Sequence, residues 1–264
     1  MTDDALRVGL LLNGTTVPAW TRRALDDMLD RTDVEITCAV VNDDPDEPGL
    51  DHYIDRVREF PLWAPVGVVH RLLPAPDYAT PAPVDDLIDD ATVVPCAPEP
   101  APDFGNVLPD DVVDDVADRA DLFVRIGFGI LKGRILDEPE HGVLSFHHGD
   151  LREYRGQPAG FWEYVNDENV AGVTLQRLNE TLDGGEIVAF EDVDLTDAHT
   201  YADVRRRLYA ASETMLTAGV RNVRADADLV TPDSLGTLYS LPEGSDVVRY
   251  LARNNVGRLK KLRA

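Results

Sequence analysis

Two apolar segments near the N-terminus most restrict what this 264-residue chain can fold into. Leu6 to Leu12 and Val34 to Val41 have the length and composition of buried strands. A helix is expected between them from near Pro18, because proline suits a first helical turn. This βαβ order predicts an α/β domain with a largely parallel sheet. The GxGxxG pattern is absent, and Asn13-Gly14 alone is weak evidence for a phosphate site.

A second pair of short apolar runs brings two reactive side chains into view. Gly142 to Phe146 and Gly172 to Leu178 are expected to be strands, with a connection and an aromatic-rich helix between them. His147 follows the first strand, and Asp183 follows the second, 36 positions further on. One βαβ unit of roughly 30 residues brings the ends of neighbouring parallel strands together. We therefore expect His147 and Asp183 to be in contact.

The sequence around this pair resembles the folate-dependent formyltransferases. Their signature runs Asn-x-His-x-Ser-Leu-Leu-Pro-x-Tyr-Arg-Gly, then Gly-Val-Thr, then Leu-Asp-x-Gly. Several separate blocks agree in order and at near-identical spacing, so the resemblance is specific, and it extends more weakly over about the first 220 residues. The matching residues are His147, Tyr154, Arg155, Gly156, Gly172, Val173, Thr174, Leu182, Asp183 and Gly185.

The resemblance implies a Rossmann-like catalytic domain over residues 1–223, a short appendage over residues 224–264, and formyl transfer from 10-formyltetrahydrofolate to an amine. It implies that His147 hydrogen-bonds the formyl oxygen, and that Asp183 keeps this histidine charged and relays protons. The stretch from Asp121 to Leu131 resembles the family loop around the pterin, with Phe128 and Ile130 as part of an apolar wall. The implied donor-binding residues are Gly127, Phe128, Gly129, Ile130, Leu131 and Leu182, and the implied acceptor-side residues are Asn13, Gly14, Arg155 and Gly156.

One position differs from the family signature in a way that bears on catalysis. The family carries an asparagine where this chain has Ser145, and that amide donates a hydrogen bond to the formyl oxygen. Removing one such donor lowers the rate on the order of 10²–10³-fold. Ser145 is either a catalytic donor with a shorter reach or a passive small residue, while His148 and Asp150 either compensate or bind the acceptor.

A metal site is the other chemistry that these residue types allow. His141, His147, His148 and Asp150 are all possible ligands. Adjacent residues of a strand point to opposite faces, however, so His147 and His148 are poorly placed to bind one ion. We expect no metal.

The charge of the chain is extreme. Its 49 acidic residues, 35 Asp and 14 Glu, stand against 25 Lys and Arg, of which only three are Lys, and the formal net charge is −24. Such a surface suits a cytoplasm of molar salt, where charges are screened within about 3 Å. We expect a halophilic protein, with an acidic surface for a cationic partner as the alternative. A nucleic-acid acceptor is disfavoured, because binding phosphates needs a basic stripe.

The cellular location and the remaining helices and loops are predicted from simpler sequence patterns. Cys38 and Cys96 have no metal-binding or CxxC spacing, no signal-like segment precedes the first strand, and no apolar run could span a bilayer, so a cytoplasmic location is expected. Residues 43–109 predict mostly loop with one or two short elements, and Thr200 to Val223 predicts one helix capped by Thr200. The aromatic residues Tyr53, Phe60 and Trp63 are expected to pack rather than to bind the acceptor.

The sequence leaves several functions open. The preferred one is transfer to a small amine such as an amino-sugar nucleotide or glycinamide ribonucleotide. The alternatives are methionyl-tRNA formyltransferase, 10-formyltetrahydrofolate hydrolase and a catalytically impaired folate-binding module. A homo-oligomer is possible, and the basic C-terminal tail could dock on the protein's own acidic face, bind a subunit or stay solvated.

Overall fold

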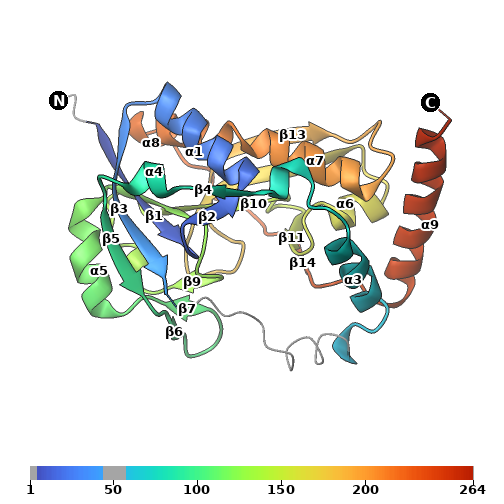
Figure 1. Ribbon diagram of the computed structural model, residues 1–264, viewed down its shortest axis with the longest axis horizontal. Helices are drawn as coiled ribbons and strands as arrows, with labels where there is room; N and C mark the ends of the chain where they lie inside the picture. The colour runs from blue at the N-terminus through green and yellow to red at the C-terminus, as the bar shows by residue number, and fades with distance from the viewer. Residues whose placement is uncertain (1–4, 44–57, 264) are drawn as a thin grey trace.

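A seven-stranded sheet forms the centre of the computed structural model, which describes residues 5–43 and 58–263 (Figure 1). Its strand order is β13-β12-β10-β8-β1-β3-β5. The strands are β1 (Leu6–Leu12), β3 (Val34–Asn42), β5 (Thr92–Cys96), β8 (Leu122–Arg125), β10 (Val143–His147), β12 (Val170–Arg177) and β13 (Glu186–Asp194).

The sheet is largely parallel, as the sequence predicts, but one detail of the prediction is wrong. The five strands from β10 to β5 run parallel to one another, whereas β10 pairs with β12, and β12 with β13, in antiparallel fashion. Residues 142–178 are therefore not a parallel βαβ unit. A short apolar run has the same composition in either direction, so the sequence could not distinguish the two.

Helices cover both faces of the sheet. One core contains Leu25 of α1, Val204 of α7 and Val220 of α8, and a second contains Val113 of α5. The predicted single helix over Thr200 to Val223 is instead two helices, with a break at Glu213-Thr214, although Thr200 caps the first one in a full capping box. The bounds are α1 (Ala19–Arg31), α5 (Asp110–Val116), η2 (Ala117–Arg119), η3 (Arg134–Leu136), α6 (Phe161–Val165), α7 (Tyr201–Ser212) and α8 (Met215–Arg224).

The described part of residues 43–109 holds more structure than predicted, including the edge strand β5 of the main sheet. Phe60 is buried, and Trp63 packs edge-on against Phe161 and Tyr250, which confirms the packing interpretation for these two residues; Tyr53 lies outside the described residues. The short elements of this region and their partners are β2 (Thr16–Pro18), α3 (Ala64–Leu72), η1 (Asp77–Ala79), β4 (Pro81–Pro83), α4 (Asp85–Ile88), β6 (Glu99–Pro100), β7 (Asn106–Val107) and β9 (Leu131–Lys132).

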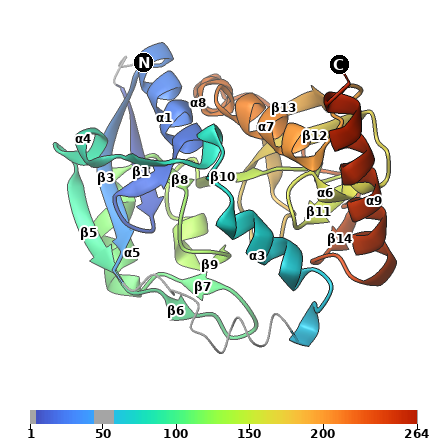
Figure 2. The same ribbon diagram turned by 45° about the vertical axis from the view of Figure 1, so that its right-hand side comes forward.

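The C-terminal residues dock onto the rest of the chain. Strand β14 (Thr237–Tyr239) pairs in parallel with β11 (Tyr154–Gly156), and α9 (Gly244–Lys261) lies beside α6 in Figures 1 and 2. Arg253 forms an ion pair with Asp167, and Lys261 forms one with Asp203, so the basic tail binds the protein's own carboxylates. The boundary at residues 223 and 224 stays a prediction. None of the helices in the described ranges is long and apolar enough to cross a membrane.

Candidate active site

Three neighbouring strands place a row of polar side chains on one face of the sheet. Ser145 and His147 are two positions apart on β10 and therefore point to the same face. In register with Ser145, β8 carries Arg125 and β12 carries Gln176. Ser145, His147 and Gln176 are all buried. The regular alternation of the strands is thus sufficient to bring polar groups together in an otherwise apolar sheet.

His147 and Asp183 are in contact, as expected from the sequence. Nδ1 of His147 lies 3.5 Å from Oδ1 of Asp183, and Nε2 lies 2.9 Å from the main-chain oxygen of Tyr154. Both neighbours of the ring are acceptors, so both nitrogens are satisfied only in the imidazolium form. Close beside the ring, a Cβ on Gly149 would come within 2.7 Å of Nε2, so this position needs glycine.

The pKa values of the pair shift in opposite directions. Burial alone lowers the pKa of His147, but the hydrogen bond and charge of Asp183 outweigh it, and the pKa lies above its ordinary value. Burial alone raises the pKa of Asp183, but His147 and the Gly156 amide stabilise the carboxylate, and that pKa lies below its ordinary value. Each member of the pair thus favours the charged form of the other.

The connection between β12 and β13 carries Asp183 to His147. Asp183 has a φ of 45°, and the Gly156 amide donates to its Oδ2 over 3.0 Å. Arg155 donates to the carbonyls of Leu182, over 3.0 Å, and of Gly236, over 2.9 Å. Arg155 and Gly156, predicted on the acceptor side, thus hold the Asp183 connection in place. Direct contact with an acceptor stays a prediction for both.

Arg125 is a site residue that the sequence prediction missed. Its Nη2 and Nε donate to Oγ of Ser145 over 2.7 and 3.1 Å, and its Nη1 contacts the Gly129 carbonyl. Burial lowers the pKa of Arg125, and the charge of Asp183 opposes this shift. The arginine sits within an apolar strand, and only the register of β8 against β10 shows that it faces Ser145.

The predicted donor-binding residues fall into two groups. Ile130, Leu131, Leu182, Asp183 and Arg125 line a cavity of about 50 Å³. Phe128 does not line this cavity: its φ is 64°, and its ring is 1% exposed within the second core. The volume is far below the roughly 300–1,000 Å³ of ligand pockets.

Asn13 contacts the backbone of the predicted donor loop. Its Oδ1 accepts hydrogen bonds from the Phe128 amide, over 2.8 Å, and from Nδ2 of Asn42, over 3.3 Å. Gly14 follows with a φ of 92°. In this structure Asn13 orders the loop at residues 126–130, and its role with an acceptor stays a prediction.

His148 and Asp150 point away from the pair. Nε2 of His148 lies 3.0 Å from Oγ of Ser212, its ring packs against Trp20, and burial lowers its pKa to about 3, so it is neutral. Asp150 forms an ion pair with Arg152. Within the described ranges, no three His, Cys, Asp or Glu residues are grouped to hold a metal ion.

Known proteins are similar to this chain in sequence and in fold. Residues 101–220 match the family model described as formyl transferase. A methionyl-tRNA formyltransferase of Bacillus pumilus is 28% identical over 143 residues, which are 53% of this chain and 42% of that protein. The chain thus spans less than half the length of that relative.

Two crystal structures show the same fold at low sequence identity. Glycinamide ribonucleotide transformylase 1 from Symbiobacterium toebii superposes with a TM-score of 0.53 and 17% identity, covering 87% of this chain and 95% of that one. An N-formyltransferase from Helicobacter canadensis, in complex with folinic acid and dTDP-3-aminofucose, superposes with a TM-score of 0.55 and 10% identity, covering 95% and 80%. Residues 101–220, which include Ser145, His147 and Asp183, are the part of the chain that matches the formyl transferase family model.

Proposed function

We propose that this chain transfers a formyl group from 10-formyltetrahydrofolate to the primary amine of a small acceptor. The observation that carries the proposal is the contact of His147 with Asp183, beside the Arg125–Ser145 pair, inside the region that matches the family. When bound, 10-formyltetrahydrofolate supplies an activated formyl carbon. In the reaction a new bond joins that carbon to the acceptor nitrogen, and its bond to the folate nitrogen breaks.

His147 stabilises the formyl oxygen. Its Nε2 is engaged by the Tyr154 carbonyl, whereas the 3.5 Å between Nδ1 and Asp183 is longer than a good hydrogen bond. The Nδ1 proton is therefore the more weakly held of the two, and it turns from Asp183 to the formyl oxygen as negative charge develops there. The charged ring is effective because it is buried, where solvent screening is weak.

Asp183 acts on protons. It keeps His147 charged, and as the nearest carboxylate it accepts the proton that the attacking amine must lose and delivers a proton to the departing folate nitrogen, through water. Its φ of 45° and the Gly156 hydrogen bond fix the carboxylate against His147.

Arg125 and Ser145 together supply the second oxyanion donor. Because Oγ of Ser145 accepts from the guanidinium, its own proton is directed away from Arg125. The positive charge of Arg125 makes that hydroxyl a stronger donor. In this proposal the pair does the work of the asparagine in the family signature.

The acceptor is proposed to be a small amine, such as an amino-sugar nucleotide or glycinamide ribonucleotide. The net charge of −24 opposes binding of a tRNA, even though the curated relative from Bacillus pumilus is a methionyl-tRNA formyltransferase. The cavity of about 50 Å³ beside Asp183 is far smaller than the whole donor, so binding of the donor requires a more open form.

A product assay tests this proposal. The purified chain, in molar KCl, is given 10-formyltetrahydrofolate with glycinamide ribonucleotide, an amino-sugar nucleotide, methionyl initiator tRNA or no amine. Formylated product and formate are measured by mass spectrometry. We expect product with a small amine, lost in Asp183→Asn and kept in the matched surface control Asp90→Asn. Formate without an amine would identify a hydrolase instead, product only with tRNA would identify the tRNA enzyme, and donor binding without turnover would leave a folate-binding module.

A further inference from the structure

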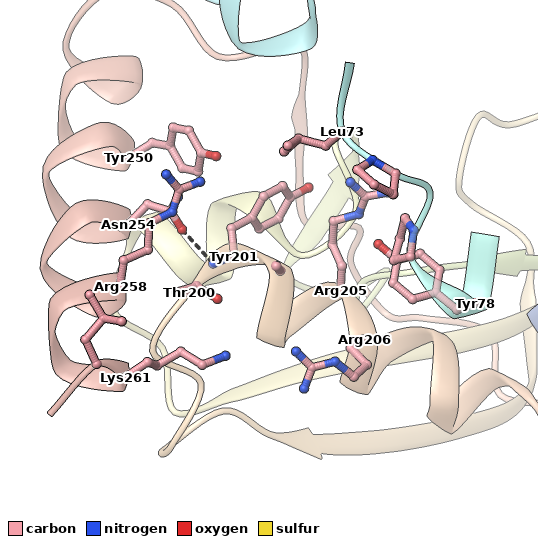
Figure 3. Close-up of a pocket in the computed structure, with 14 residues that line it drawn as sticks. Leu73, Tyr78, Thr200, Tyr201, Arg205, Arg206, Tyr250, Asn254, Arg258 and Lys261 are labelled. Atoms are coloured by element: carbon pink, nitrogen blue, oxygen red, sulfur yellow. Dashed lines mark hydrogen bonds between the residues drawn. The ribbon is translucent and has the colours of Figure 1, made fainter. Parts of the chain in front are cut away.

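A second, larger cavity lies apart from the candidate active site. Its volume is about 620 Å³, within the range of small-molecule sites, and none of Arg125, Ser145, His147 or Asp183 lines it. Its walls come from the chain after α3, from the start of α7 and from α9 (Figure 3). Three segments far apart in the sequence therefore build it.

The charge of this cavity is opposite to that of the chain. Four basic side chains line it, and its described lining contains no Asp or Glu, although the chain carries 49 acidic residues. Figure 3 shows two of the cations on α7 and two on α9, on opposite sides of the cavity. The four are Arg205, Arg206, Arg258 and Lys261. Such a concentration of positive charge indicates an anionic ligand.

A single nearby carboxylate pairs with two of these four cations. Asp203, just outside the lining, accepts from Arg206 over 2.8 Å and from Lys261 over 2.7 Å. Within the described ranges, Arg205 and Arg258 have no carboxylate at ion-pair distance, and Arg205 lies over the rings of Tyr78 and Tyr201 at 5.6 and 5.8 Å. No carboxylate of the described residues therefore neutralises these two guanidinium groups.

The rest of the wall is aromatic and apolar. Tyr78, Tyr201 and Tyr250 contribute rings, and Leu73 and Pro74 contribute apolar surface. An inorganic anion would contact only the basic part of this lining. A ligand that joins a planar ring to a phosphate group uses both, because rings stack on tyrosine and guanidinium groups bind phosphate in a bidentate manner.

We propose that this cavity binds a phosphorylated aromatic compound of the nucleotide class. Its phosphates lie between Arg205 on α7 and Arg258 on α9, and its ring lies against the tyrosines. The proposal does not depend on the formyl transfer proposed above.

Calorimetric titration of the full chain with ADP, in molar KCl, tests the proposal. We expect saturable binding of one ADP. Arg258→Gln and Arg205→Gln are each expected to weaken it at least about tenfold, since a hydrogen bond to a charged group is lost. Arg119→Gln, which removes the same charge from a surface outside the cavity, leaves binding unchanged. Arg258 is exposed, so its variant tests the site even if Arg205→Gln fails to fold.

Three further ligands separate the parts of the proposal. Adenosine and inorganic pyrophosphate are each expected to bind more weakly than ADP, because each satisfies only one half of the cavity. If citrate binds as tightly as ADP, the cavity recognises polyanions in general and the nucleotide class is wrong. Absence of saturable ADP binding, or ADP binding that is unchanged in both arginine variants, would overturn the proposal.

Discussion

Arg125 on β8 donates two hydrogen bonds to the hydroxyl of Ser145 on β10, the neighbouring strand in register. A serine in the middle of a buried apolar strand is thereby tied to a fixed positive charge. Because the guanidinium fills the space beside Ser145, a larger residue at position 145 would have to displace it. The two residues therefore act as one unit.

The first prediction concerns this pair. Arg125→Leu and Ser145→Ala are each expected to lower kcat on the order of 10²–10³-fold, the effect of losing one oxyanion donor. The double variant should be no worse than about tenfold below either single variant, since the second change removes an interaction that is already lost. Arg125→Lys serves as the control, because lysine keeps the positive charge but lacks the two donor nitrogens of the guanidinium. Its kcat should lie between those of the natural chain and Arg125→Leu. Fully additive losses would show that the residues act independently.

Asp183→Asn is expected to lower kcat at least about 10²-fold, because the proton acceptor is gone. Folate affinity should change by less than about threefold, since the amide of asparagine still accepts from Gly156 and interactions made only in the transition state do not affect binding. Steady-state kinetics and calorimetry separate the two effects. Turnover near that of Asp90→Asn would refute the role of Asp183.

The pKa of His147 gives a prediction about pH. Asp183 holds that pKa above about 6.5, the ordinary value, so the imidazolium should persist to a higher pH than that of a free histidine. In Asp183→Asn the charge of Asp183 is lost while the burial remains, so the pKa of His147 should fall. NMR titration of the ring protons measures both. His148, with a pKa of about 3, should not titrate between pH 5 and 9, which provides an internal control. An unchanged His147 pKa in the variant would contradict the coupling.

Glu163 on α6 is a buried carboxyl whose Oε1 has no hydrogen-bond partner among the described residues. Burial raises its pKa to about 7, so the folded state holds a proton that the unfolded state has released above pH 4.5. The protonated carboxyl therefore makes its full contribution to the free energy of unfolding below pH 4.5. This contribution is lost as the pH rises to 7. At pH 8, Glu163→Gln should be more stable than the natural chain by on the order of 3 kcal/mol, and at pH 5 nearly equal.

Chemical denaturation at the two pH values measures this difference. Glu153→Gln, at an exposed position, is the matched control and should change stability little at either pH. A Glu163→Gln variant that is less stable at pH 8 would show that the ionised carboxylate has a partner.

The sequence predicted those features that depend on local chemistry. The apolar runs predicted strands β1, β3 and β10, and Thr200 as a capping residue predicted the start of α7. The sequence missed features that depend on pairing across the sheet: the antiparallel direction of β12, and Arg125, whose position only the β8–β10 register reveals. The sequence also did not predict edge strand β5, because Pro95 and the exposed residues of this strand weaken its apolar pattern.

The contact of His147 with Asp183 was expected for an incomplete reason. The expectation relied on neighbouring parallel strands, but β10 and β12 are antiparallel, so the end of β12 lies beside the start of β10. The connection after β12, held by Arg155 and Gly156, is what carries Asp183 to His147. Tertiary hydrogen bonds of this kind leave no periodic signal in a sequence.

Donor binding tests the central proposal most directly, because it needs no knowledge of the acceptor. Titration of the chain in molar KCl with 5-formyltetrahydrofolate, a stable folate, should give saturable heat for one bound molecule. Ile130→Glu, which places a charge in the wall of the small cavity, should weaken binding at least about tenfold, while Val256→Glu, on the exposed part of α9, should not. Absence of saturable binding, or equal binding in both variants, would contradict the proposed donor site.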